Sequence, residues 1–84
     1  MNANATQMDE LVNQIARSLV DRPQDVLVNA VESGHSMVLE LHVAKEDLGK
    51  IIGKKGRTAQ ALRVLIGAAG AKTKKRTLLE IIDQ

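Results

Sequence analysis

No phenylalanine, tyrosine or tryptophan occurs among the 84 residues of this chain, so its core must be built from aliphatic side chains and methionine. Aromatic side chains bury large areas, and a chain this short buries only roughly 60% of its unfolded surface. We therefore expect one small domain of modest stability, for which association with a second chain would add buried area. Hydrophobic residues make up 44% and charged residues 26%, which indicates a globular protein and not a disordered one.

The composition also excludes several kinds of site. There is no cysteine, which rules out a disulfide framework, a thiol nucleophile and a cysteine zinc site. The two histidines, His35 and His42, are too few for a metal centre of their own. We therefore expect neither a metal nor a cofactor. No apolar run is long enough to span a membrane and the N-terminus does not resemble a secretory signal, so we expect a cytoplasmic location and no membrane insertion.

The net charge of +2 hides an uneven distribution. Residues 1–42 carry two basic and six acidic side chains, whereas residues 43–84 carry ten basic and four acidic ones. Residues 50–76, the basic stretch, contain no acid and nine bases: Lys50, Lys54, Lys55, Arg57, Arg63, Lys72, Lys74, Lys75 and Arg76. Such a stretch attracts a polyanion by Coulomb steering and counterion release, although a solvated lysine-rich surface has the same composition. A nucleic-acid binder with this sequence would have to work without the aromatic stacking that RRM and OB domains use.

Hydrophobic periodicity predicts a helix at the start of the chain. Apolar residues recur at helical spacing over residues 8–20, which indicates an amphipathic helix. Thr6 and Asp9 have the spacing of a capping box, which would start the helix near Gln7, and Pro23 limits its end. We therefore assign residues 1–7 to a flexible leader.

A hairpin, two helices and a strand are predicted after this helix. Residues 26–31 and 37–43 read as antiparallel strands around a turn at residues 32–35. Residues 45–52 read as a short helix and residues 77–82 as a final strand. Between them lies a helix over residues 57–69, with Gly70 as its C-terminal cap and an apolar face made of Ala61, Leu62, Leu65, Ile66 and Ala69. The predicted order is α-β-β-α-α-β, in one domain that covers residues 8–84.

The sequence Gly-Lys-Lys-Gly at residues 53–56, called the GKKG loop below, joins the two later helices. Glycine permits backbone angles that a side chain forbids, and it clears space for a phosphate. The helix that starts at about Arg57 presents unpaired N–H groups and the positive end of its dipole. The lysines of the loop, with Lys50 before it and Arg57 after it, add full positive charges. A bare G-x-x-G also occurs in plain helix–helix turns, so the basic context carries this interpretation.

Other functional classes fit the residues less well. A P-loop requires G-x-x-x-x-G-K-[ST], which the sequence around Gly49 and Gly53 does not satisfy. The adjacent carboxylates Glu46 and Asp47 suit the first turn of a helix, and no serine belongs to a recognisable triad, so we do not expect an enzyme. A helix-turn-helix is the best structural rival, but the hairpin and the final strand argue against it.

Residues 51–58, I-I-G-K-K-G-R-T, resemble the I-G-x-x-G core of K-homology (KH) domains. The order of elements looks like the type II, prokaryotic, arrangement of that fold. The chain resembles the KhpA-like family of small bacterial RNA-binding proteins with a single KH domain, over about residues 8–83. The helix end at residues 21–23 and the closing L-x-I-I-D segment also fit that family. Ala59 departs from it, because many KH domains have a larger aliphatic residue there.

The resemblance implies an α+β fold, with a three-stranded sheet packed against three helices, and a non-catalytic role. KH domains bind about four nucleotides of single-stranded nucleic acid, with the GXXG loop on the backbone. The match implies these RNA-binding residues: Gly53, Lys54, Lys55, Gly56, Arg57, Lys50, Ile51 and Ile52. One of the two isoleucines would line the base groove and the other would anchor the short helix, and the sequence leaves open which. It also leaves open whether Arg63 and the bases at residues 72–76 contact RNA.

The resemblance further implies self-association, pairing with a larger KH-containing protein, and a role in post-transcriptional regulation or as a chaperone of RNA. The alternative hypothesis is a dimerisation or adaptor module, in which protein–protein contact is the main role and nucleic-acid binding is weak. The aliphatic core supports it, because association would add buried area.

Overall fold

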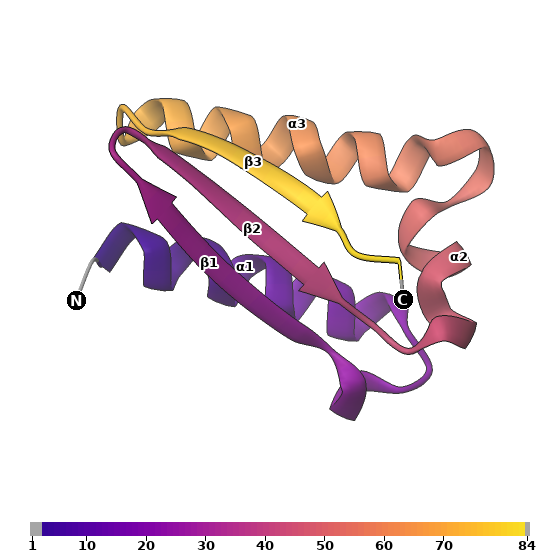
Figure 1. Ribbon diagram of the computed structural model, residues 1–84. Coiled ribbons are helices and arrows are strands. Elements are labelled where there is room, and N and C mark those ends of the chain that lie inside the picture. Colours follow the sequence, from indigo (N-terminus) through magenta and orange to yellow (C-terminus); the bar gives the residue numbers. More distant parts are fainter. Residues whose placement is uncertain (1–2, 84) are drawn as a thin grey trace.

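The structure, a computed structural model, describes the backbone of residues 3–83 and the side chains of residues 7–83. Its helices and strands follow the predicted α-β-β-α-α-β order (Figure 1). They are α1 (Ala3–Leu19), β1 (Leu27–Ser33), β2 (Ser36–His42), α2 (Leu48–Ile52), α3 (Arg57–Lys72) and β3 (Arg76–Ile81). Three single 3₁₀ turns accompany them, at η1 (Pro23–Asp25), η2 (Lys45–Asp47) and η3 (Lys54–Gly56). The predicted α+β fold class is therefore confirmed.

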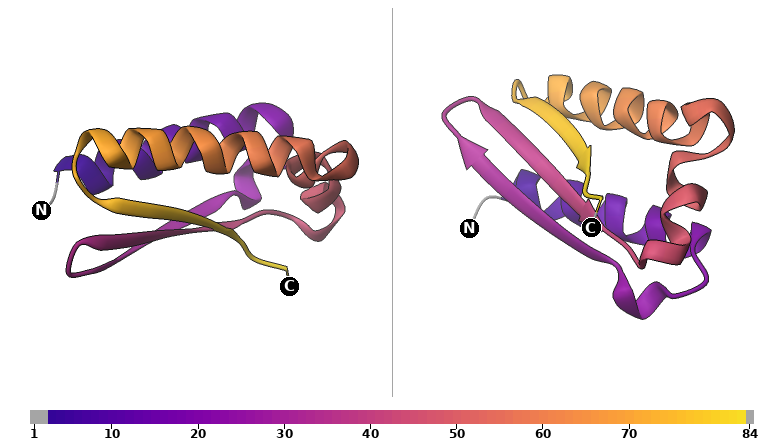
Figure 2. Two further views of the ribbon diagram at one scale, coloured as in Figure 1. Left: turned by 90° about the horizontal axis from the view of Figure 1, so that it is seen from above. Right: turned by 45° about the vertical axis from the view of Figure 1, so that its right-hand side comes forward.

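The three strands form one mixed sheet in the order β1-β2-β3. β1 and β2 pair antiparallel around a two-residue turn at Gly34 and His35, and β3 lies parallel to β2 on its other side. Helices α1 and α3 both lie over one face of the sheet, and the opposite face is open (Figure 2). α2 stands at one end of the molecule, where it contacts both α1 and α3.

Aliphatic residues and methionine build the core, as the composition requires. The central strand β2 supplies Met37, Leu39 and Leu41, which alternate with half-buried residues on the open face. This alternation is the strand period of two, with one face of the sheet packed and the other wet. The buried core cluster is Met8, Val12, Ala16, Met37, Leu39, Leu41, Val43, Ile51, Leu62, Ile66 and Leu79.

The first helix starts earlier than predicted. α1 begins at Ala3, so the start near Gln7 is wrong, and Thr6 lies inside the helix and not at a capping position. The segment before Gln7 contains no helix breaker, and alanine has the highest helix propensity, so the helix extends across it. Met1 and Asn2 lie outside the described residues. The domain boundary at residue 8 stays a prediction.

The end of α3 also differs from the prediction. The helix continues to Lys72, and Gly70 lies within it, buried against the start of β3. A Cβ atom on Gly70 would be 2.3 Å from Thr77 Oγ1, so glycine allows this close approach. Lys74, with a φ of 59°, terminates the helix instead. The Lys75 N–H donates to the Gly70 carbonyl and the Lys74 N–H to the Ala71 carbonyl, which is the Schellman pattern.

Only part of the predicted apolar face of α3 is buried. The buried stripe consists of Ala59, Leu62, Ile66 and Gly70. Ala61 and Leu65, which we predicted to be in the core, are exposed, and Leu65 keeps 55% of its surface accessible. Apolar residues occur on both sides of this helix, so periodicity could not tell which side faces the sheet.

Candidate nucleic-acid interface

The GKKG loop reverses the chain between α2 and α3 with backbone angles that are rare outside glycine. Gly53 has φ 77° and ψ 174°, and Gly56 has φ 74° and ψ 12°. A Cβ atom on Gly53 would be 2.2 Å from Thr58 Oγ1, whereas one on Gly56 would meet nothing within 4 Å. The two glycines therefore have different roles: Gly53 allows close packing on α3, and Gly56 leaves open space at the start of that helix.

Lys55 also has left-handed backbone angles, with φ 57° and ψ 26°. For a residue with a Cβ atom this conformation costs about 1–2 kcal/mol. Strain of this kind gathers at ligand-binding turns, where the surrounding structure enforces it. The loop thus holds an exposed lysine in a conformation that its own backbone disfavours.

The N-terminus of α3 carries an unusual charge pattern. No side chain caps it, and its first turn contains no acid. Lys54, Lys55 and Arg57 surround it, all exposed, and none forms an ion pair within residues 7–83. Cations at the positive end of a helix dipole are unfavourable by themselves. An anion at this position would be favoured by the positive end of the helix dipole and by the three cations.

The structure distinguishes the two isoleucines of α2. The Ile51 side chain is fully buried in the core, whereas Ile52 is 39% exposed. Ile52 lines a groove that begins beside the GKKG loop, so Ile51 anchors α2 and Ile52 faces the groove. The Ile51 side chain has no accessible surface, and the predicted role of the two isoleucines in RNA binding stays a prediction.

The groove has a volume of about 240 Å³ and lies between α2, α3 and the end of β3. Its lining residues are Leu48, Ile52, Gly56, Ala59, Arg63, Ile81 and Asp83. Ala59 is buried here, and its small side chain leaves room that a larger aliphatic residue would fill. Arg63, whose contact with RNA the sequence left open, is one of these lining residues. Its i+4 spacing from Ala59, on the same helix face, was the signal that could have placed it.

The edge of β3 that faces away from β2 borders the same groove. The Arg76 N–H bonds to the His35 carbonyl and the Ile82 N–H to the Leu41 carbonyl, so these even-numbered residues point toward β2. In a parallel strand the backbone groups alternate between the two edges, so the odd-numbered residues point outward. Arg63 confirms this, because its Nε donates to the Leu79 carbonyl at 3.4 Å. The backbone of Ile81 therefore faces the groove.

Lys50 points into a different environment from the loop lysines. Its Nζ lies 3.0 Å from Asp21 Oδ2 and 3.4 Å from Asp47 Oδ1. Asp47 is 1% exposed and also accepts hydrogen bonds from the backbone N–H groups of Asp21 and Arg22, at 3.2 and 3.0 Å. These contacts tie the segment after α1 to the start of α2. The carboxylates largely neutralise the charge of Lys50, one of the residues that we predicted to bind RNA.

The pKa values of Asp47 and Lys50 are both shifted by these contacts. Burial alone would raise the pKa of Asp47, but hydrogen bonds from the N–H groups of Asp21 and Arg22, together with Lys50, outweigh it. The pKa of Asp47 is therefore held below its ordinary value of 3.8. Hydrogen bonds to Asp21 and Asp47 raise the pKa of Lys50. Both groups are thus charged at neutral pH.

The basic stretch of the sequence divides into two separate places. The GKKG loop lies at one end of α3 and residues 73–76 lie at the other (Figure 1). α3 has 16 residues, so its ends are about 24 Å apart. Lys75 also forms an ion pair with Glu32 at the hairpin. The bases at residues 72–76 therefore do not extend the surface around the loop.

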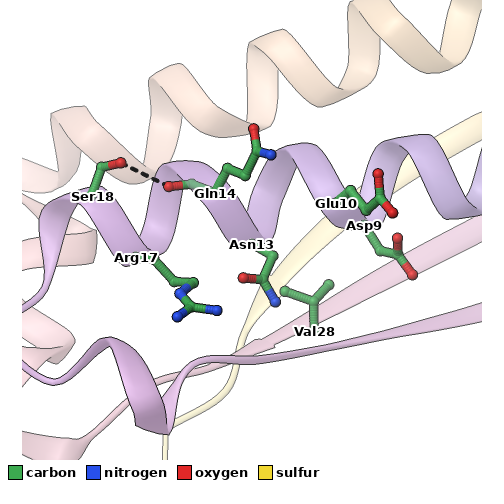
Figure 3. A pocket seen from close by; sticks show the side chains of 7 residues that line it. All are labelled: Asp9, Glu10, Asn13, Gln14, Arg17, Ser18 and Val28. Atoms are coloured by element: carbon green, nitrogen blue, oxygen red, sulfur yellow. Dashed lines mark hydrogen bonds between the residues drawn. The ribbon is translucent and has the colours of Figure 1, made fainter.

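A larger hollow lies elsewhere among the described residues. It has a volume of about 1000 Å³ and is formed by the polar face of α1 and by Val28 of β1 (Figure 3). Its polar lining mixes Asp9 and Glu10 with Arg17, and it includes none of the predicted RNA-binding residues. Its mixed charge does not favour a polyanion.

Two kinds of site are absent from the part of the chain that the structure describes. No cluster of three or more potential metal ligands occurs there. None of the described helices combines the length and apolar character that a membrane-spanning helix requires.

A three-stranded mixed sheet, with a G-x-x-G loop between two helices on its packed side, defines a KH domain of the type II arrangement. The sequence model of the family described as "KhpA/KhpB, KH domain" matches residues 9–81. The chain therefore belongs to this family of KH domains, as the resemblance predicted. This membership also confirms that the chain is not an enzyme.

Curated relatives from several bacteria are similar over most of their length. The chain is 55% identical over 75 residues to "RNA-binding protein KhpA" of Caldanaerobacter subterraneus subsp. tengcongensis. The matched segment covers 89% of this chain and all of the relative. The protein of that name from Clostridium perfringens is 53% identical, with the same coverage. The one from Borreliella burgdorferi is 50% identical over 88% of this chain and 90% of its own. No solved structure matches the chain.

Proposed function

We propose that this chain is an RNA-binding protein that holds short single-stranded segments through the GKKG loop and the adjoining groove. The observation that carries the proposal is the N-terminus of α3: it is uncapped, free of acids and surrounded by three unpaired cations. It opens directly into an aliphatic groove. The N-terminus of α3 and its cations suit a phosphate backbone, and the aliphatic groove suits nucleobases. The names of the relatives agree with this proposal.

The predicted contact residues take different roles in this proposal. Gly53 and Gly56 let the RNA backbone approach the loop, and Lys54, Lys55 and Arg57 neutralise its phosphates. Bases would lie on Ile52 and the other aliphatic side chains of the groove, since no aromatic platform exists. The two remaining predicted residues, Ile51 and Lys50, would act indirectly, by holding α2 in place.

The test replaces both loop lysines with aspartate. Fluorescence anisotropy with a short uracil-rich RNA should show loss of binding by the Lys54→Asp/Lys55→Asp variant and unchanged circular dichroism. The matched control is Lys72→Asp/Lys74→Asp at the far end of α3. It changes the net charge by the same amount, and Lys74, like Lys55, has a positive φ. The control should keep most of its affinity. Equal affinity of both variants for RNA would disprove the proposal.

Salt dependence provides a second measurement on the wild-type chain. If the loop neutralises three phosphates of a single strand, the slope of log affinity against log salt should be about −2. A slope near zero would mean that the loop cations do not contact the backbone.

We also propose that the chain associates with a second copy through the exposed side of α3. Val64 and Leu65 are 64% and 55% exposed and lie next to each other on this helix. Burying them would enlarge a core that contains no aromatic side chain. Sedimentation should show a dimer that Leu65→Glu dissociates. Val31→Glu on the open sheet face, where Val31 is 50% exposed, is the control and should remain dimeric.

The alternative adaptor role has its own supporting observation on the open face of the sheet. Val31 pairs with Val38 and Val38 with Leu78, which places three apolar side chains in one row across the strands. Pairing with a larger KH-containing protein would use such a surface. If the adaptor role dominates, the lysine double variant keeps its cellular function and a Val31→Glu variant loses it.

The cellular role follows from RNA binding. We place the chain in the cytoplasm, as a post-transcriptional regulator or chaperone of transcripts. Crosslinking to cellular RNA followed by sequencing, with wild type and the Lys54/Lys55 double variant compared, would identify the transcripts. Equal recovery of RNA by both proteins would contradict this role.

A further inference from the structure

The groove beside the GKKG loop contains two charged side chains of opposite sign. Arg63 comes from α3 and Asp83 follows β3, and the other lining residues are aliphatic or glycine. Neither forms an ion pair with any of the described residues. Both are exposed, so they can meet a ligand in the groove.

The hydrogen bond of Arg63 leaves part of its guanidinium available. Its Nε donates to the Leu79 carbonyl on the edge of β3, which holds the side chain along the groove. The two terminal nitrogens keep their donors, and arginine has no acceptor. Asp83, when ionised, has only acceptors. The groove therefore presents a donor pair and an acceptor pair to whatever it binds.

Among the side chains that line the groove, only Arg63 and Asp83 carry polar groups that could discriminate between bases. The aliphatic walls offer the same contact to every base, and the chain has no aromatic side chain that could favour one by stacking. A base whose edge forms hydrogen bonds with both Arg63 and Asp83 binds more tightly than a base that forms neither.

Guanine matches this pair of groups better than the other bases. Its O6 and N7 are acceptors that arginine contacts as a pair, the commonest specific arginine–base contact. Its N1–H and N2–H₂ are two donors on the adjoining edge, suited to the two oxygens of a carboxylate. Uracil has one donor on its ring, and adenine and cytosine each present a single amino group.

We infer that Arg63 and Asp83 make the groove prefer guanine. This inference rests on the proposed RNA-binding function and adds the base that the groove selects. Arg63 supplies the hydrogen-bond donors and Asp83 supplies the acceptors. Ile52 supplies an apolar wall of the groove near the loop.

The experiment uses the full chain and four fluorescein-labelled hexanucleotide RNAs. One contains only uracil, and the others carry a single guanine, adenine or cytosine near the centre. Anisotropy titrations should show the guanine-containing RNA binding about tenfold tighter than the uracil RNA, a difference of about 1.4 kcal/mol. The adenine and cytosine RNAs should bind within about threefold of the uracil RNA.

Two exposed, near-isosteric replacements test the assignment. Arg63→Lys keeps the charge but loses the planar pair of donors, and Asp83→Asn replaces half of the acceptor pair by a donor. Each should abolish the guanine preference. The readout is the ratio of each variant's affinities for the guanine-containing RNA and the uracil RNA, so a general loss of RNA binding is not counted as a loss of preference. Glu80→Gln, on the open face of the sheet, is the matched control and should keep the preference.

The outcomes separate this inference from the function on which it rests. If no RNA binds, the proposed function fails, and the inference fails with it. If all four RNAs bind wild type equally, or another base is preferred, the function stands and the guanine inference is overturned. A guanine preference that survives both Arg63→Lys and Asp83→Asn also overturns the assignment of these residues.

Discussion

Replacing Gly53 with alanine would add a Cβ atom 2.2 Å from Thr58 Oγ1, 2.7 Å from Thr58 Cβ and 3.0 Å from the Thr58 backbone nitrogen. A rotation of the threonine side chain removes only the first contact, so the loop or the start of α3 must shift. Overpacking of this kind costs about 1–3 kcal/mol. The φ of 77° and ψ of 174° add about 1–3 kcal/mol, because this region is almost exclusive to glycine. We expect the Gly53→Ala variant to lose about 4 kcal/mol of unfolding free energy.

Thermal unfolding followed by circular dichroism measures this loss. For a domain of this size, 1 kcal/mol shifts the Tm by roughly 4–8 °C, so Gly53→Ala should melt roughly 15–30 °C lower. Gly56→Ala has the left-handed strain without the clash, and should lose about 1–2 kcal/mol. Gly67→Ala has neither, lies inside α3, and should gain about 0.5–1 kcal/mol. A Gly53→Ala variant that melts no lower than Gly56→Ala would refute the reasoning about the clash with Thr58.

Three further predictions concern the residues that position the loop. Lys55→Gly relieves left-handed strain of about 1–2 kcal/mol, and the entropy of the unfolded glycine chain offsets part of this gain. The variant should be up to about 1 kcal/mol more stable in denaturant titrations, while RNA affinity falls, and a variant less stable than wild type would contradict the strain at Lys55. Ile51→Ala should cost about 2–5 kcal/mol, whereas the half-exposed Ile52→Ala should cost less than 1 kcal/mol and weaken RNA binding instead; similar losses of stability would contradict their different burial. The lowered pKa of Asp47 contributes stability above its unfolded value of 3.8, and this contribution is lost as pH falls through the lower pKa of the folded state. Asp47→Asn should therefore be less stable than wild type at pH 7 and lose less on acidification, and parallel pH–stability curves would exclude this role.

The GKKG loop shows how far local sequence predicts structure. Its two glycines predicted a tight turn, and both have positive φ in the structure. The same rule failed at Gly70, which we predicted to be a helix cap. Gly70 lies inside α3 because β3 returns against it, and Lys74 ends the helix with the angles that a glycine would ordinarily take. A glycine thus indicates either a turn with positive φ or a close contact with another segment. Which of the two occurs depends on residues distant in the sequence.

The groove shows the complementary limit. Ile51 and Ile52 are adjacent and chemically identical, so no pattern in the sequence could tell which is buried. Arg63 lies within the groove although it is six residues beyond Arg57 in the chain, and the bases at residues 72–76 lie far from it although they continue the same basic stretch. The rigid 24 Å of α3 separates charges that the sequence shows as one run.

The order of helices and strands, the turn at residues 53–56 and a core without aromatic side chains could all be read from the residues. Each depends on neighbours within a few positions: helical or strand periodicity, glycine angles and side-chain type. The sides of α3 and α2 that are buried, the place of Arg63 beside Ile81 and Asp83, and the division of the basic stretch came from the folded chain. They depend on how α3 lies across the sheet and how β3 joins the edge of β2. That packing brings together residues far apart in sequence, and hydrophobic periodicity is equally satisfied by either side of a helix that is apolar on both.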